Sequence, residues 1–306
     1  SFISRILSES ISQAVNDNSE AKISVKSLAK LLLVFLIVVP LYSKIYLTFF
    51  AFTSFFKPWR KSLFLDLFLF EIHQIYFWKK NVNFSSLFLN AGAHIQHHYF
   101  FNSKVLKDSK FKNPQWYIKS NEDPIHDMLK TYDHLLGKVL NLKNTDTIIA
   151  TGLSQEPYDK LKFYYRLKNH AKFLNKFDIK FKSIHPRMTR DFLISFENND
   201  QLMDAYFKLS NLKVNNQSLL FKEIEKRNLE LFVTLTYPQE IFANTKCCLD
   251  ELCVNLEDYV VFVAIKNGMH QSKGYAYFSN GIKKRVLNDG DNIYKLNQTI
   301  LKYFVK

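Results

Sequence analysis

The sequence predicts an α/β protein in which a mostly parallel sheet lies between helices, with a helical N-terminal part and a small inserted α+β module. Three observations support this fold class. Residues 1–80 consist mainly of long apolar runs, which are typical of packed helices. Residues 81–175 and 239–306 combine continuous apolar runs with an amphipathic helix, as in a strand–helix–strand unit. Residues 176–238 alternate polar and apolar side chains, which is typical of half-exposed strands.

Composition limits the classes of function. The chain has 306 residues, 47% of them hydrophobic, with 29 Phe and 16 Tyr, so it can bury a substantial core. The net charge of +14 favours an anionic partner. We expect an anionic small molecule or a phosphorylated or sulfated substrate as the partner, and nucleic acid is less favoured. The lysines, however, are spread along the chain instead of forming one run. A general compositional bias toward lysine explains the charge equally well.

The helical N-terminal part should begin with a helix over residues 3–15, followed by the apolar run Leu31–Tyr42 and a helix over 62–80. The run of twelve residues is interrupted by Pro40 and is shorter than the about 20 residues that span a bilayer. Residues 31–59 are a candidate for peripheral contact with a membrane surface. No secretory signal is visible, so we expect a cytoplasmic protein. The first residue is Ser, which is consistent with further residues upstream.

Histidines cluster after the first predicted strand of the core. The β-type run Phe84–Leu89 ends at Asn90, and His94, His97 and His98 follow, which are three of the nine histidines. Ligands of α/β proteins bind at the carboxyl ends of strands. This segment is therefore the candidate functional site.

A helix and a second strand complete the predicted parallel unit. Asp123 and Pro124 supply an N-cap and a first-turn proline, and apolar residues follow at helical spacing. A short apolar strand over 147–150 then ends at Thr151.

The inserted module should contain strands within 177–184 and 190–196, a capped helix over 198–212, and two more strands before residue 238. Arg187 and Arg190 could hold a phosphate bidentately, or could pair with nearby carboxylates.

The C-terminal part should contain a strand over 259–265, a loop with His270, a strand over 275–279 and a closing helix. Cys247, Cys248 and Cys253 have no zinc-site spacing. We expect them to be buried thiols on a helix, which favours a reducing compartment.

Three segments together resemble one known family. They are NAGAHIQHHYF, GMHQSKGYAYFSNGI and IYKLNQTILKYF, in this order, and they are similar to the alkaline phosphatase superfamily, nucleotide pyrophosphatase/phosphodiesterase-like branch. The resemblance covers roughly residues 80–160 and 240–306. It implies a metal-dependent hydrolase of phosphate or sulfate esters, with Asn90, His94 and His270 holding a divalent metal ion, zinc first. Imidazole nitrogens are suitable zinc ligands.

Departures from the family pattern are also present. The Asp and His that would hold a second metal ion are absent at residues 150–153, and no nucleophile is visible. The second metal site is therefore degenerate, and two-metal chemistry needs both ions. We expect His97, His98, Thr151 and Gln155 to contact the substrate.

Two alternative functions remain open. A non-catalytic relative could bind an anionic ligand or a partner in the same cleft. Alternatively, the C-terminal part could be an RNA-binding domain similar to the RNA-recognition motif. In that case Lys273–Phe278 and Leu231–Leu235 would be neighbouring strands, and Cys247–Val254 would be the helix between them.

Overall fold

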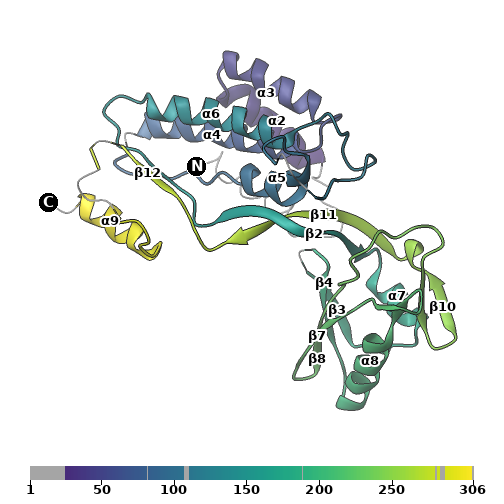
Figure 1. The fold of residues 1–306 in the computed structure, drawn as a ribbon. Coiled ribbons are helices and arrows are strands. Elements are labelled where there is room, and N and C mark those ends of the chain that lie inside the picture. Colours follow the sequence, from purple (N-terminus) through teal and green to yellow (C-terminus); the bar gives the residue numbers. More distant parts are fainter. Residues whose placement is uncertain are drawn as a thin grey trace. The chain divides into compact units, whose positions relative to one another are not determined.

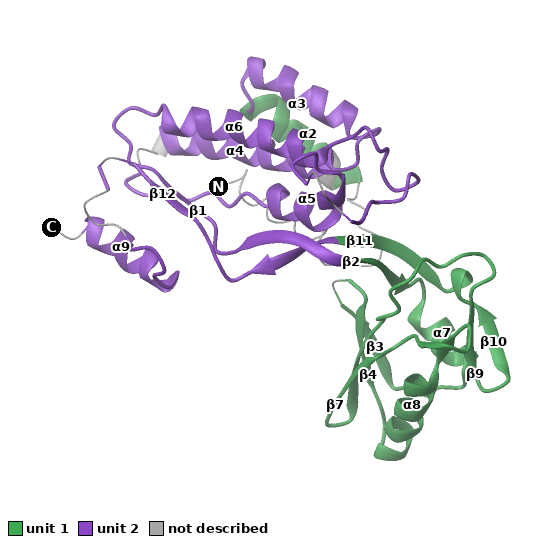
Figure 2. Cartoon of the chain, in the orientation of Figure 1, with its two compact units in different colours: residues 1–38, 160–266 green, residues 39–159, 267–306 purple. Residues whose placement is uncertain are grey.

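The computed structural model describes residues 25–80, 82–106, 110–187, 189–279, 281–282 and 287–304 (Figure 1). The chain forms two compact units: unit 1 contains residues 1–38 and 160–266, and unit 2 contains residues 39–159 and 267–306 (Figure 2). Two strands, β2 (Ser154–Leu167) and β11 (Val260–Gln271), pair with each other and carry the chain from one unit to the other. Unit 1 therefore includes more of the chain than the expected module 176–238. The helix expected over 3–15 lies outside the described residues.

Unit 2 is built around one long buried helix. Its helices are α3 (Leu41–Thr53), α4 (Arg60–Lys80), α5 (Ala91–Tyr99) and α6 (Pro124–Leu140), and α4 contacts the other three. A helix that is apolar on most faces must be covered on most faces, and this expectation for α4 is confirmed. Its buried apolar side chains are Leu63, Leu67, Phe68, Phe70 and Ile72.

The start of α6 follows from its sequence. The Asp123 side chain accepts a hydrogen bond from the backbone N–H of His126 at 3.0 Å, and Pro124 occupies the first turn. The apolar stripe that predicts this helix is buried through Ile125, Met128 and Leu135. The predicted helix is therefore confirmed.

A buried ion pair joins α4 to α6. Arg60 donates from Nε and Nη2 to the two carboxylate oxygens of Asp127, at 2.9 and 3.0 Å, and the Trp59 indole donates to the same carboxylate at 2.9 Å. Burial alone would raise the pKa of Asp127, but the hydrogen bonds from Arg60 and Trp59 lower it overall. The segment that precedes α4 is thereby fixed to α6.

The predicted parallel sheet is wrong: the protein is a mixed α/β chain with small antiparallel sheets. β1 (Ile148–Ala150) pairs antiparallel with β12 (Ala276–Phe278). Residues 84–89 form no strand, and Phe84 and Phe88 are exposed. A short apolar run is compatible with a strand, but a strand needs a hydrogen-bonded neighbour, and this run has none among the described residues.

Unit 1 contains an antiparallel sheet in the order β3 (Ser183–Pro186), β4 (Asp191–Ser195), β8 (Glu230–Thr234) and β7 (Glu223–Arg227). Helices α7 (His170–Lys176) and α8 (Asn199–Asn211) belong to the same unit, as does α2 (Val25–Val38). Asn198 caps α8 by accepting from the backbone N–H of Gln201 at 3.0 Å. The capped helix, the strand within 190–196 and the two strands before residue 238 are confirmed. The strand expected within 177–184 is wrong for most of its length, because β3 begins only at Ser183. The core includes Phe173, Phe192, Phe221 and Leu231.

The cysteine segment forms a hairpin, so the predicted helix is wrong. β9 (Lys246–Leu249) pairs antiparallel with β10 (Leu252–Asn255), in a sheet with β5 (Lys213–Val214) and β6 (Ser218–Leu219). Cys248 lies opposite Cys253 and is disulfide-bonded to it, whereas Cys247 is a buried free thiol. Asp250 at the turn has a φ of 51°, which a helix does not accommodate. The expectation that all three cysteines are thiols is therefore wrong, and the reducing compartment inferred from it is no longer supported.

The remaining elements are short. Two 3-10 turns, Phe100–Asn102 and Leu256–Asp258, follow α5 and β10, and α9 (Tyr294–Phe304) closes the described chain. In unit 2, the Phe304 ring of α9 contacts Phe84, with ring centroids 6.1 Å apart. Within the described part of the chain, every helix is too short or too polar to cross a membrane.

Candidate functional site

The N-terminus of α5 is held by side chains of two other helices. The Asp66 carboxylate on α4 accepts from the backbone N–H groups of Asn90 and Ala91, at 3.2 and 2.9 Å. The Tyr132 hydroxyl on α6 donates to Asp66 at 2.8 Å and accepts from the N–H of Gly92 at 2.7 Å. A carboxylate near a helix N-terminus is stabilised by the helix dipole and by the unsatisfied N–H groups. These bonds fix the start of the histidine-bearing helix.

Burial determines the titration of this cap. It raises the pKa of Asp66, although the hydrogen bonds from Ala91 and Tyr132 act in the opposite direction. Burial, followed by the charge of Asp66, raises the pKa of Tyr132. Tyr132 is thus a hydrogen-bond donor throughout the neutral range.

Two glycines permit close approach of other elements to α5. A Cβ at Gly92 would lie 2.9 Å from the Tyr132 ring. A Cβ at Gly268 on β11 would lie 2.5 Å from Oε1 of Gln155 and 2.7 Å from the backbone oxygen of Gln96. Because glycine has no Cβ, strand β11 can lie directly against α5 at this point.

This contact brings together four imidazoles, which we call the histidine cluster: His94, His97, His98 and His270. Nε2 of His97 lies 2.9 Å from Nε2 of His270, two residues after Gly268 on β11. His94 and His98, one turn apart on α5, have ring centroids 4.5 Å apart. The partner of His270 is therefore His97, where the sequence pattern had indicated His94.

Two members of the cluster, His94 and His98, are held in the neutral form at physiological pH. Burial, and then the neighbouring charges of His94 and His97, lower the pKa of His98 to about 3. Burial, and then His97, lower the pKa of His94. A neutral imidazole has a lone pair that can accept a proton or bind a metal ion. In the His97–His270 pair one nitrogen donates and the other accepts.

The His97–His270 pair fits two positions of a zinc coordination sphere. Zinc–nitrogen bonds of about 2.0–2.1 Å at tetrahedral angles place two ligand nitrogens about 3.3 Å apart, close to the observed 2.9 Å. No group of three or more His, Cys, Asp or Glu side chains in the described residues is arranged to hold a metal ion. The pair alone thus supplies two ligands, one fewer than a typical catalytic zinc site.

The other expected site residues lie as follows. Asn90 is exposed at the first position before α5, and its side chain makes no capping bond. Gln155 on β2 donates to the backbone oxygen of Ala93 at 3.2 Å, and its buried Oε1 has no hydrogen-bond partner in the described structure. Thr151 lies next to the paired strands β1 and β12, where its Oγ1 accepts a hydrogen bond from the backbone N–H of Tyr275 at 2.9 Å. Gln155 therefore contacts the histidine-bearing helix α5, whereas Thr151 bonds to the backbone beside β12.

Sequence reasoning missed the residues that support the cluster. Asn113, in the loop after α5, and Asn267, on β11, form a buried reciprocal amide pair with bonds of 2.8 and 2.9 Å. Asn267 also accepts from the backbone N–H of Phe101 at 2.9 Å. Asp66 could have been found, because a carboxylate in the apolar run of α4 must have donors nearby when buried.

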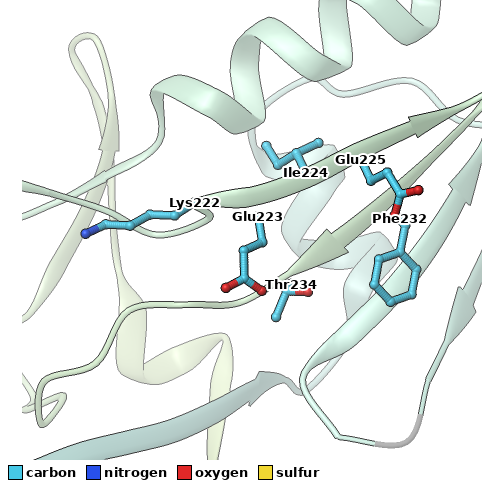
Figure 3. A pocket seen from close by; sticks show the side chains of 6 residues that line it. All are labelled: Lys222, Glu223, Ile224, Glu225, Phe232 and Thr234. Atoms are coloured by element: carbon cyan, nitrogen blue, oxygen red, sulfur yellow. The ribbon is translucent and has the colours of Figure 1, made fainter. Parts of the chain in front are cut away.

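Unit 1 offers a separate shallow hollow on strands β7 and β8. It has a volume of about 360 Å³, and Figure 3 shows its lining side chains, which are Lys222, Glu223, Ile224, Glu225, Phe232 and Thr234. Two carboxylates against one ammonium group do not suit an anionic ligand. Arg190 donates to the backbone oxygen of Leu235 at 3.1 Å and lies over the Tyr164 ring.

The strand arrangement expected for an RNA-recognition motif is absent from the described residues. β8 and β12 belong to different sheets, and the segment expected as the intervening helix is the cysteine hairpin. The comparisons with protein families, curated proteins and solved structures found no match to this chain. The resemblance to the alkaline phosphatase superfamily stays a prediction.

Proposed function

We propose that the protein is a metal-dependent hydrolase of phosphate or sulfate esters, phosphodiesterase-like, with a single divalent ion, zinc foremost. We place the ion on His97 and His270. The observation that carries this proposal is the 2.9 Å approach of two Nε2 atoms from positions 173 residues apart in the chain. Imidazole pairs with this spacing are suitable for zinc and similar ions.

The chemistry of the cluster favours an anionic ester as the ligand. Both ligands of the proposed ion are imidazoles, so a bound divalent ion would keep most of its positive charge. A metal ion with two protein ligands also has open positions, where it can polarise an ester oxygen and lower the pKa of bound water. His94 and His98 are the nearby groups that would orient the ester, because a ring N–H can donate to its oxygens.

Metal binding can be tested without an activity assay. The purified chain is titrated with Co²⁺, whose visible absorption reports on nitrogen ligands, and with Zn²⁺ by calorimetry. We expect stoichiometric binding that weakens at least about tenfold in His97→Ala and in His270→Ala. His185→Ala is the matched control, because His185 is an exposed histidine on β3 of unit 1. Unchanged affinity in both cluster variants would exclude this metal site.

Turnover is tested with a bis-aryl phosphodiester and an aryl sulfate in the presence of Zn²⁺ or Mn²⁺. Hydrolysis that is lost in both cluster variants, and kept in the control, supports the hydrolase. If the protein binds the metal ion and phosphate but hydrolyses neither ester, it is instead a non-catalytic protein that binds an anionic ligand. The absence of the Asp and His of a second metal site at residues 150–153 favours the non-catalytic protein.

A further inference from the structure

Helix α3 has two apolar faces, although a surface helix needs only one. Ser43, Leu47 and Phe50 are buried, and α3 contacts α4 within unit 2. The opposite face consists of large apolar side chains that are 53 to 82% exposed. We call them the α3 stripe; its members are Leu41, Tyr42, Ile45, Phe49, Phe52, Phe55 and Phe56.

The α3 stripe is continuous along the helix. With 3.6 residues per turn, Leu41, Ile45, Phe49 and Phe52 fall within an arc of about 80°. The turn after the helix adds Phe55 and Phe56, whose exposed fractions are 82 and 74%. Contiguous exposed apolar surface of this kind marks a site of interaction, whereas single exposed apolar residues do not.

The α3 stripe rests on a rigid support. Arg60 donates to Thr53 Oγ1 at the end of α3 at 2.9 Å, and its guanidinium lies 5.4 Å from the centroid of the Phe49 ring. The same guanidinium is held by Asp127 of α6. The stripe therefore exists before any partner binds, and little conformational entropy is lost on docking.

The charged side chains of the segment that carries the α3 stripe are all basic. Residues 41–61 contain no Asp or Glu but carry Lys44, Lys57, Arg60 and Lys61. Asp127 pairs with Arg60, and Lys57 shares a hollow with carboxylates of the α6 region, whereas Lys61 is exposed. Each lysine close to an anionic lipid surface strengthens binding about fivefold.

We propose that the α3 stripe docks on the surface of an anionic lipid bilayer, with α3 lying in the plane of the membrane. The helix has 13 residues, about 20 Å in length, which is too short to cross the hydrocarbon core. Aromatic and aliphatic side chains on one face, with lysines beside them, are typical of interfacial helices. A second copy of the chain would instead bring the same lysines together, and like charges oppose that contact.

Vesicle flotation tests the proposal, which does not depend on the proposed hydrolase activity. The whole chain is mixed with neutral phosphatidylcholine vesicles or with vesicles containing about 30% phosphatidylserine, in low and high salt. We expect binding to the anionic vesicles only, weakened by salt. Lys57→Gln with Lys61→Gln should weaken it about thirtyfold, and Phe55→Ser with Phe56→Ser at least about tenfold.

Controls distinguish docking from misfolding and from self-association. Phe207→Ser removes an equally exposed phenylalanine from α8 of unit 1 and should leave vesicle binding unchanged. Tryptophan emission and thermal melting establish that each variant is folded. Absence of binding by the folded wild type, or equal binding to neutral and anionic vesicles, overturns the proposal. A concentration-dependent dimer that the Phe55/Phe56 double variant abolishes, without vesicle binding, would assign the stripe to a second copy.

Discussion

Gly268→Ala should disrupt the approach of β11 to α5 on which the histidine cluster depends. The added Cβ would lie 2.5 Å from Gln155 Oε1 and 2.7 Å from the backbone oxygen of Gln96. Ordinary contacts of this kind exceed 3.4 Å, so about 0.7–0.9 Å of displacement is needed. The Gln155 side chain can rotate, but the Gln96 oxygen is part of the helix. Overpacking of this kind costs about 1–3 kcal/mol, and we expect about 2 kcal/mol.

A second glycine supplies the matched control. Gly137 on α6 has open space around the position of its missing Cβ. Gly137→Ala should therefore stabilise the protein by about 0.5–1 kcal/mol, because alanine is the better helix former. The two substitutions are chemically identical and lie in the same unit, but their effects on stability should have opposite signs.

The assays are urea unfolding and thermal unfolding, both monitored by tryptophan emission. All three tryptophans, Trp59, Trp78 and Trp116, belong to unit 2, so the signal reports on the unit that contains both glycines. We expect Gly268→Ala to lower the thermal midpoint by about 4–8 °C and to weaken Co²⁺ binding. A Gly268→Ala protein as stable as the wild type would show that β11 and α5 are not in close contact, and the proposed metal pair would then lose its structural basis.

Two further effects on stability are expected. Asp127→Ala leaves the Arg60 guanidinium, whose side chain is 11% exposed, without its partner. It should lower the free energy of unfolding in urea by about 3 kcal/mol, compared with about 1 kcal/mol for Arg60→Lys. Equal stability of Asp127→Ala and wild type would contradict the buried ion pair. Burial against Phe192, and then the charge of Arg166, lower the pKa of His170 to about 4, whereas the unfolded chain titrates near 6.5. Between these two pKa values only the unfolded chain binds the proton. The free energy of unfolding should therefore be highest above about pH 6.5 and should fall by about 2 kcal/mol from pH 7 to pH 5. Circular dichroism of wild type and His170→Gln measures this, and the same loss in both proteins would exclude His170 as the cause.

Local signals in the sequence predicted individual helices well. Asp123 with Pro124 located the start of α6, and the capped helix of unit 1 begins at Asn199 directly after Asn198. Both predictions rest on side chains that satisfy N–H groups within the same few residues. Such signals do not depend on distant parts of the chain.

Strand pairing was predicted poorly because each strand needs a partner that local sequence does not identify. The run at 84–89 is apolar but unpaired, and the strand at 148–150 pairs antiparallel with 276–278. The cysteine segment contains no helix-breaking Gly or Pro, so its pattern fits a helix, yet Cys248 and Cys253 face each other across a hairpin. The pairing decides the structure in each case.

The choice of His97 over His94 as the partner of His270 shows the same limit at the site. On α5 the two histidines are three residues apart, and the spacing from Asn90 favoured His94. Which of them meets β11 depends on where the strand touches the helix, and Gly268 against Gln96 sets that contact. Gln96 is the residue before His97, and His270 is two residues after Gly268, so the close approach of the two backbones aligns those two imidazoles.

A double variant separates the two contributions to this alignment. If the Gln155 side chain alone opposes a Cβ at position 268, Gln155→Ala should restore full stability and Co²⁺ affinity to Gly268→Ala. Because the backbone oxygen of Gln96 lies within 2.7 Å of the same Cβ position, we expect Gln155→Ala to recover only part of the loss, with the two effects failing to add. Partial recovery of stability without recovery of Co²⁺ affinity would locate the determinant of the metal pair in the backbone contact between β11 and α5.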